Sequence, residues 1–142
     1  MHQNLILLPV FAQVILTYVI LMRMGPLRSR SIEERGQITQ DVALAGDGVW
    51  NESALKASNN YKNQFEIPAL FYAVTAFALI TGNADPWMLV LAWAFVLSRI
   101  VHSIIHVGVN VVLWRATAFA VGASILALMW LLLMWRVAVA GF

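Results

Sequence analysis

The sequence contains no cysteine and very few charged residues. Without a thiol the chain can form no disulfide, no thiolate metal site and no catalytic protein thiolate. Charged residues make up only 11% of the chain, far fewer than in most water-soluble domains. No basic run with interleaved aromatic residues marks a nucleic-acid surface, so we expect no nucleic-acid partner.

Apolar residues take the place of the missing charges. They form 61% of the chain, and the mean hydropathy is +0.78. This composition predicts one domain, residues 1–142, with the lipid bilayer as its solvent. The first apolar run is too long for a signal peptide core and no basic region precedes it. We therefore expect it to remain as a membrane helix.

Four apolar segments are long enough to cross a membrane. At about 1.5 Å per residue, each matches the roughly 30 Å hydrocarbon layer. We predict transmembrane helices at about residues 4–24, 54–81, 86–109 and 115–136, with a polar loop at about 25–53. The fold class is thus an all-α integral membrane four-helix bundle. A small-residue patch, Gly122-Ala123-Ser124, predicts close packing of the last helix.

Prolines and small polar residues mark where these helices begin, bend and end. Gly25-Pro26 should end the first helix, because proline has no N–H to continue it. Asn51 or Ser53 should cap the second helix. Pro68 should kink that helix, since it removes the backbone hydrogen bond to the carbonyl of Gln64.

The polar loop holds Arg28, Arg30 and Arg35 and is flanked by Arg23, Lys56 and Lys62, whereas the central turn, residues 81–86, has no lysine or arginine. The positive-inside rule therefore places the loop in the cytoplasm and both termini outside. We expect an integral protein of a bacterial inner membrane. The loop is long for a small bundle, so a functional role and a plain connecting role both stay open.

A polar face lies where the second helix enters the membrane. Asn59, Asn63 and Glu66 are spaced i, i+4 and i+7, which places them on one helix face. A carboxylate facing hydrocarbon would cost about 2.5 kcal/mol or more. This face should therefore look into protein.

Basic and imidazole side chains lie at the same depth. Arg99, His102 and His106 are spaced i, i+3 and i+7 and share one face of the third helix. The other basic residues at this depth are Lys62, Arg23 and Arg115. We predict that all of these polar groups converge in the cytoplasmic half of the bundle.

Simpler interpretations stay open. Glu66 and Arg99 can form a structural ion pair, and Arg23 can extend its charge to the membrane surface. The two histidines can be hydrogen-bonded core residues. Their one-turn spacing also suits a metal or haem, but no second intramembrane pair of histidines exists, so we predict no metal site.

Several cationic groups around one carboxylate suit a small zwitterionic anion. A short peptide with two carboxylates and one ammonium group has this chemistry. Arg115 opens the last helix, so the positive end of the helix dipole adds to its own charge. A thiol with an ordinary pKa of about 8.5 would shift toward thiolate there.

Three short motifs, in order along the predicted helices, carry a resemblance to a known family. They read Asn59-x-x-x-Asn63-x-x-Glu66 followed by Pro68, Arg99-Ile100-x-His102 followed by His106, and Arg115-Ala116. With four helices, a long first connector and a short third one, the chain resembles the MAPEG family, the membrane-associated proteins in eicosanoid and glutathione metabolism. The resemblance covers most of the chain.

The resemblance implies a homotrimer that binds glutathione as co-substrate between neighbouring subunits. It implies a glutathione transferase or peroxidase acting on a lipophilic small molecule from the bilayer. Carried over by position, Glu66 would hold the ammonium group of the peptide, with Asn63 and Lys62 on its polar ends. Arg115 would stabilise the thiolate as the catalytic residue. The remaining matched positions, which line or brace the site, are Arg99, His102 and Arg23.

Three positions depart from the family pattern. Asn59 stands where the family carries an arginine, His106 where it carries a tyrosine, and Phe119 where some members carry a tyrosine. These departures favour an alternative, a non-catalytic MAPEG-fold protein acting as a binding or accessory subunit. A small transporter or channel subunit is a third hypothesis, which association with a larger complex would support.

Overall fold

The computed structural model describes residues 3–35, 40 and 50–140. Within the ranges 3–35 and 50–140 lie a short 3-10 turn, η1 (Gln3–Ile6), and five α-helices. The helices are α1 (Leu7–Arg35), α3 (Glu52–Lys62), α4 (Ile67–Ile80), α5 (Pro86–Val107) and α6 (Val112–Ala140). The rest of the predicted polar loop, residues 36–39 and 41–49, lies outside the described residues.

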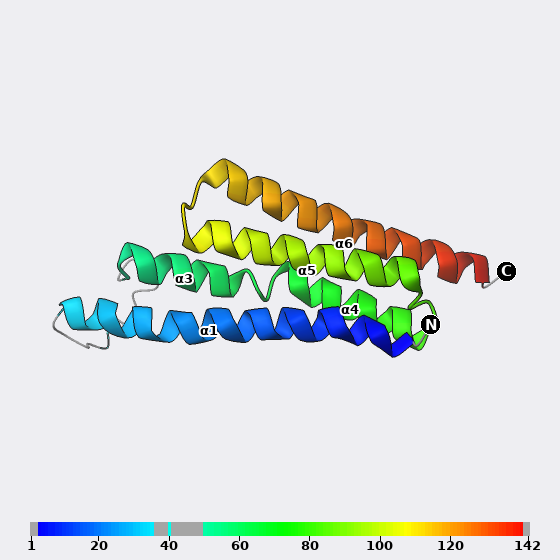
Figure 1. Ribbon diagram of the computed structural model, residues 1–142, viewed down its shortest axis with the longest axis horizontal. Coiled ribbons are helices and arrows are strands. Elements are labelled where there is room, and N and C mark those ends of the chain that lie inside the picture. Colours follow the sequence, from blue (N-terminus) through cyan, green and yellow to red (C-terminus); the bar gives the residue numbers. More distant parts are fainter. Residues whose placement is uncertain (1–2, 36–39, 41–49, 141–142) are drawn as a thin grey trace.

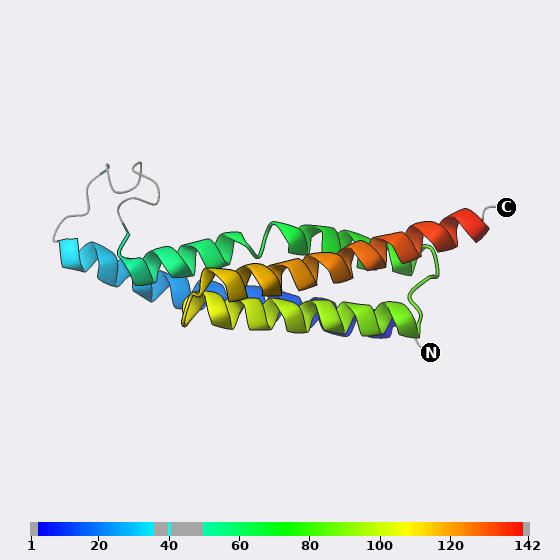
Figure 2. The same cartoon turned by 90° about the horizontal axis from the view of Figure 1, so that it is seen from above.

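The helices run alongside one another as a long bundle, with α3 and α4 following one line (Figure 1). Four helical stretches, 3–35, 52–80, 86–107 and 112–139, are long and apolar enough to span a membrane. The predicted class, an all-α four-helix membrane bundle, is therefore confirmed. The start of α1 and the end of α6 lie at one end of the bundle, and the end of α1 and the start of α3 lie at the other (Figure 2).

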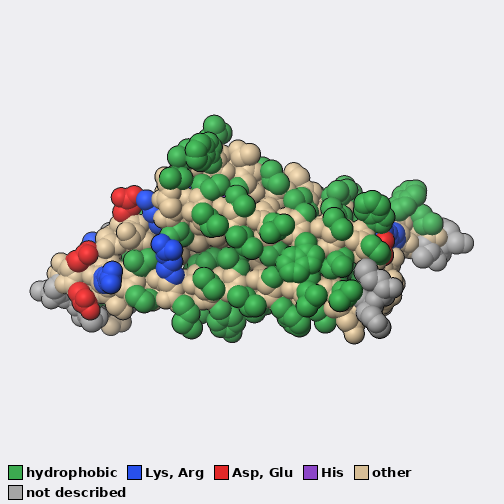
Figure 3. Space-filling model, in the orientation of Figure 1, with side chains coloured by type: hydrophobic (Ala, Val, Ile, Leu, Met, Phe, Trp, Pro, Cys, Tyr) green, Lys and Arg blue, Asp and Glu red, His purple; other side chains and the backbone are tan. Residues whose placement is uncertain are grey.

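Charged side chains gather at the ends of the bundle. Figure 3 shows most of them at the end where α1 ends and α3 begins, a small group near the opposite end, and a hydrophobic surface between. Large apolar side chains are exposed along this surface on every membrane-spanning stretch. Such a belt is what a bilayer-facing surface requires.

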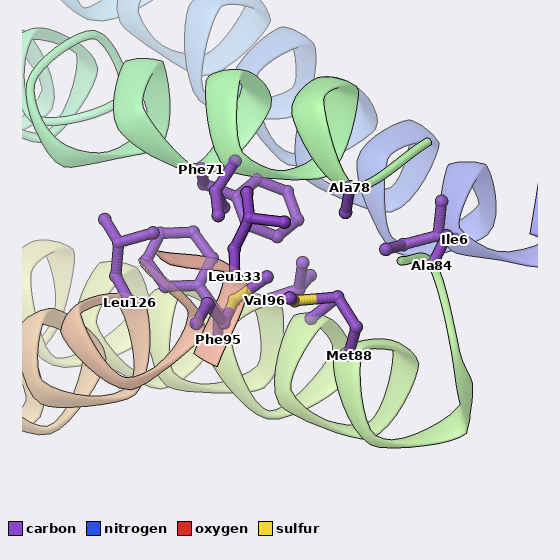
Figure 4. Close-up of a cluster of buried hydrophobic side chains, with 12 residues drawn as sticks. Ile6, Phe71, Ala78, Ala84, Met88, Phe95, Val96, Leu126 and Leu133 are labelled. Carbon is purple, nitrogen blue, oxygen red and sulfur yellow. The ribbon is translucent and has the colours of Figure 1, made fainter. Parts of the chain in front are cut away.

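The apolar core lies toward the end that carries the chain termini, between α4, α5 and α6 (Figure 4). Phe71 and Phe95 are both 0% exposed, and their rings stack with centroids 4.6 Å apart. Met88 and Met129 are also completely buried. Between membrane helices such contacts stabilise by van der Waals packing. The polar site described below lies outside this cluster, toward the other end.

The predicted end of the first helix at Gly25-Pro26 is wrong, because α1 continues to Arg35 with Pro26 inside it. Contacts with α3 and with the residue before it stabilise the part of α1 that follows Pro26. The Nε of Arg28 donates to the Oγ of Ser58 at 3.0 Å, and the backbone N–H of Asn51 donates to the Oγ of Ser31 at 2.8 Å. These tertiary contacts offset the hydrogen bond that proline removes.

The second apolar segment forms two consecutive helices and not one kinked helix. The chain leaves helical geometry at residues 63–66, so α3 ends at Lys62 and α4 begins at Ile67. Pro68 lies in the first turn of α4, where its missing N–H would have no intrahelical partner anyway. The predicted kink at Pro68 is therefore a complete break before it. Asn51 caps α3 as predicted, because its side chain accepts from the backbone N–H of Ala54 at 2.9 Å.

Polar side chains take up the backbone groups that this break leaves exposed. The Nε2 of Gln64 donates to the carbonyl of Asn60 at 3.1 Å, and the Nε2 of Gln13 donates to the Oε1 of Gln64 at 3.0 Å. From α5, the Nη2 of Arg99 donates to the carbonyl of Asn63 at 3.2 Å. Non-helical backbone is tolerated at membrane depth only with such partners.

The small-residue patch on α6 places Gly122 directly against Ser98 of α5. A Cβ at Gly122 would lie 2.7 Å from the Oγ of Ser98 but 3.7 Å from its Cβ. We expect Gly122→Ala to destabilise the protein, because overpacking costs about 1–3 kcal/mol while alanine returns at most about 1 kcal/mol in helix propensity. Gly122→Ala combined with Ser98→Ala should recover most of the loss in thermal unfolding.

Gly25→Ala is the matched control, since a Cβ there meets nothing within 4 Å. It should not lower the unfolding temperature. A Gly122→Ala loss that persists in the double variant would show that the Oγ of Ser98 is not the limiting contact.

An ion pair joins α6 to the turn that precedes α5. The Nη2 of Arg136 lies 2.6 Å from the Oδ2 of Asp85, and its Nη1 donates to the carbonyl of Asn83 at 3.3 Å. The other carboxylate oxygen of Asp85 accepts from the backbone N–H of Met88 at 2.9 Å and caps α5. Partial burial alone would raise the pKa of Asp85, but the bonds from Arg136 and Met88 and the arginine charge outweigh it, so the pKa lies below its usual value.

We expect Asp85→Asn to lower the unfolding free energy by roughly 1 kcal/mol at pH 7, because asparagine keeps the cap but loses the partly exposed ion pair. The folded-state pKa is depressed, so this stabilisation is present above the unfolded pKa of about 3.9 and is lost as the pH falls through the folded pKa. Unfolding temperatures of the two proteins should therefore converge in acid. Glu52→Gln, which removes the exposed pair with Lys56, should change little. A pH-independent difference between Asp85→Asn and wild type would contradict the ion-pair assignment.

Candidate functional site

A cavity of about 370 Å³ lies where the end of α3 and the helix break face the end of α5 and the start of α6. Its walls are polar on the α3 side and partly apolar on the α6 side. The lining residues are Asn59, Lys62, Asn63, Glu66, His102, His106, Val112, Arg115, Ala116 and Phe119. The volume is within the range of about 300–1,000 Å³ usual for small-molecule sites.

The cavity brings together all the predicted site residues except Arg99 and Arg23. The two helical spacings in the sequence and the start of the last helix therefore converge on one place. The helix break turns Asn63 and Glu66 out of regular helix at this wall. Glu66 is exposed and Asn63 is half-buried, so both are open to a ligand.

Arg99 lies behind the wall. It is 0% exposed, and its guanidinium carbon lies 5.8 Å from the centre of the Phe119 ring. No ion pair joins Arg99 to Glu66, the simpler arrangement that the sequence left open, and Arg99 donates instead to the carbonyl of Asn63. Arg99 therefore positions the segment that carries Asn63 and Glu66.

His102 joins α5 to α6. Its Nδ1 lies 3.2 Å from the backbone carbonyl of Arg115, and because a carbonyl only accepts, Nδ1 carries the hydrogen. Its ring lies 5.8 Å from that of His106 and 6.0 Å from that of Phe119. The Nε2 of His102 and the Nδ1 of His106 have no hydrogen-bond partner within the described part of the chain. The described residues hold no group of three or more histidine, aspartate or glutamate side chains arranged for a metal.

Arg115 lies in the first turn of α6, which begins at Val112, three residues before the predicted start at 115. Its Nη1 donates to the Oδ1 of Asn110 at 3.0 Å. Asn110 has a φ of 49°, a left-handed geometry that asparagine adopts more readily than most residues. Sequence reasoning missed Asn110, although an asparagine just before a helix is the kind of residue that such a turn selects.

Arg23 lies elsewhere. It lines a second cavity between α1, α3 and α5, whose lining residues include none of those of the first. The prediction that Arg23 joins the other site residues therefore does not hold within one chain. The depth of Arg23 along the first helix was predictable, but the side of the helix that faces α6 was not.

The first cavity is positively biased. Among the described residues its wall carries two basic side chains, Lys62 and Arg115, and one carboxylate, Glu66, and the buried guanidinium of Arg99 lies behind Asn63. Arg115 adds the positive end of the α6 dipole. This arrangement favours a ligand with more negative than positive groups and one ammonium.

Fold and site together define an integral membrane four-helix bundle with one polar, cationic cavity near one end of its apolar belt. The MAPEG family model matches residues 6–135, so the chain belongs to the MAPEG family. Comparisons with curated proteins and with solved structures gave no match.

Proposed function

We propose that this protein is a membrane glutathione transferase or peroxidase. The observation that carries the proposal is the meeting, in one cavity, of the carboxylate of Glu66, the amide of Asn63, and the basic side chains of Lys62 and Arg115. Glutathione has two carboxylates, one ammonium group and one thiol. Each of these groups has a chemical complement in the wall.

Glu66 binds the ammonium group of glutathione, and Asn63 and Lys62 bind its polar ends. Asn63 is well placed for this, because Arg99 fixes its backbone from behind. Asn59 lines the cavity with a neutral amide where the family pattern has an arginine, so binding relies on Lys62 and Arg115 for positive charge.

Arg115 stabilises the glutathione thiolate. The S–H bond breaks with loss of the proton to solvent, and the guanidinium together with the α6 dipole holds the resulting anion. In conjugation, the thiolate sulfur attacks an electrophilic carbon, the C–S bond forms and the leaving group departs with its electron pair. The hydrogen bond to Asn110 keeps Arg115 in place before the reaction.

The second substrate is lipophilic and arrives through the bilayer. Val112, Ala116 and Phe119 form the apolar side of the cavity, and Val112 is 67% exposed on the outer surface of α6. An apolar entrance at the lipid-facing surface favours a hydrophobic electrophile or hydroperoxide. The cationic end of the bundle faces the cytoplasm, where glutathione is available.

The assembly is proposed to be a homotrimer, on the basis of family membership. The exposed apolar faces of the helices leave ample surface for copies to pack against one another. A trimer would place a neighbouring chain beside the cavity and narrow its opening.

The test is a rate assay on the purified protein in detergent, with glutathione and a chromogenic aromatic electrophile. We expect turnover that saturates with glutathione and is inhibited by S-alkylated glutathione. Thermal unfolding with the same inhibitor reports binding separately from chemistry. Stabilisation without turnover would favour the alternative, a non-catalytic binding subunit, which the neutral Asn59 supports. A protein that shows neither turnover nor stabilisation would exclude both the enzyme and the glutathione-binding subunit.

A further inference from the structure

The second cavity, between α1, α3 and α5, has a volume of about 340 Å³ and plays no part in the proposed glutathione site. Its walls are mainly apolar, with Leu16, Val19 and Ile20 from α1 opposite Ile100 and Ile104 from α5. Val19 and Ile104 are also exposed on the outer surface, by 59% and 67%. The cavity is therefore a crevice that opens toward the bilayer.

An unpartnered buried amide faces this crevice. Asn60 lines it and is 0% exposed, yet neither its Oδ1 nor its Nδ2 has a hydrogen-bond partner among the described residues. Its neighbour Gln64 is already bonded to Gln13 and to the carbonyl of Asn60. An orphaned buried amide costs about 1–3 kcal/mol, and more where no water reaches. A ligand with a hydrogen-bond acceptor would remove part of this penalty.

A cation lies at one end of the crevice. Arg23 lines it and is exposed, and it forms no ion pair or hydrogen bond with the described part of the chain. Along α1, Val19 is about one helical turn and Leu16 about two turns deeper than Arg23. The crevice thus combines a cation at one end of its α1 wall, an unpartnered amide in its α3 wall, and apolar side chains deeper along α1.

We propose that this crevice binds one anionic phospholipid of the bilayer. Its phosphate pairs with Arg23, an ester carbonyl accepts from the Nδ2 of Asn60, and one acyl chain fills the space between α1 and α5. A lipid matches both the cation at the end of this crevice and its apolar walls.

The experiment is native mass spectrometry of the purified protein with added phosphatidylglycerol or phosphatidylcholine, without glutathione. Wild type should retain phosphatidylglycerol in preference to phosphatidylcholine. Arg23→Gln should lower retained phosphatidylglycerol about fivefold, as expected for one arginine at an anionic lipid. Arg30→Gln is the matched control, because Arg30 is exposed on the same helix and does not line the crevice.

Asn60→Leu tests the deeper contact. It removes the unpartnered amide and replaces it with a side chain of similar size. Lipid retention should fall, while the unfolding temperature measured without lipid should rise or stay level. This pair of opposite changes separates a ligand contact from a purely structural role.

The proposal is overturned by equal retention of the two lipids, by equal effects of Arg23→Gln and Arg30→Gln, or by an Asn60→Leu variant that keeps its lipid. It is also overturned if Arg23→Gln weakens glutathione binding and leaves lipid retention unchanged, since Arg23 would then serve the glutathione site of an adjacent subunit. Because lipid binding is measured without glutathione, its outcome is independent of the proposed enzymatic function.

Discussion

Replacing Arg115 with alanine is expected to lower kcat for conjugation by about 10²–10³-fold, the usual effect of removing one group that stabilises a developing anion. Arg115 is the basic residue of the cavity wall that lies in the first turn of α6, where the helix dipole reinforces its charge. Without it the thiol keeps an ordinary pKa, so little thiolate forms at neutral pH. Initial rates with a chromogenic electrophile measure the loss.

Two comparisons make the Arg115 result specific. Arg115→Lys keeps the charge and should retain part of the rate, although lysine cannot reproduce the bond to the Oδ1 of Asn110. Raising the pH should rescue Arg115→Ala in part, because the free thiol then ionises unaided. Arg115→Ala with full activity at neutral pH would show that another group stabilises the thiolate.

Replacing Glu66 with glutamine is expected to weaken glutathione binding by about 10–100-fold, since a hydrogen bond to a charged group contributes roughly 1.5–3 kcal/mol. Glu66 supplies the sole carboxylate of the cavity wall among the described residues. Because Glu66 is exposed and unpaired with Arg99, the substitution should leave the unfolding temperature almost unchanged. Calorimetry on the detergent-solubilised protein measures the binding constant.

A glutathione analogue that lacks the ammonium group sharpens this test. Wild type should bind the analogue about as weakly as Glu66→Gln binds glutathione, and Glu66→Gln should no longer distinguish the two ligands. Glu33→Gln is the matched control, because Glu33 is exposed on α1 and does not line the cavity. Equal losses in Glu33→Gln and Glu66→Gln would point to a general charge effect.

The overall fold was predictable from hydropathy because the bilayer fixes the length of each apolar segment. The exact ends of the helices could not be predicted in this way. Gly25-Pro26 has the local chemistry of a helix stop, but the bonds of Arg28 and Ser31 to α3 and the residues before it carry α1 further. These contacts join residues distant in the sequence, so no local pattern reveals them.

The helix break has a similar explanation. Pro68 signals a disturbance of the second helix, but its position depends on Gln64 and Arg99, which satisfy carbonyls before the proline. A free carbonyl at membrane depth is tolerated only where a partner from another helix reaches it. The sequence contains Arg99 but does not say that its guanidinium points to the backbone of Asn63.

Most of the site could be predicted because helical spacing alone places residues on a common face. Asn59, Asn63, His102 and His106 follow this rule and line one cavity. The rule does not say which face of α1 meets the other helices, and within one chain Arg23 lines a different cavity from the other site residues. Asn110, which holds Arg115, lies in a turn, where periodicity gives no information.

The proposed function requires that a glutathione molecule occupies the cavity at the α3–α4 break. A cryo-electron microscopy map of the purified protein with saturating glutathione tests this occupancy most directly. We expect tripeptide-shaped density in this cavity, with its ammonium end at Glu66 and its sulfur beside Arg115. A cavity that stays empty under saturating glutathione, or a tripeptide bound away from both residues, would contradict it.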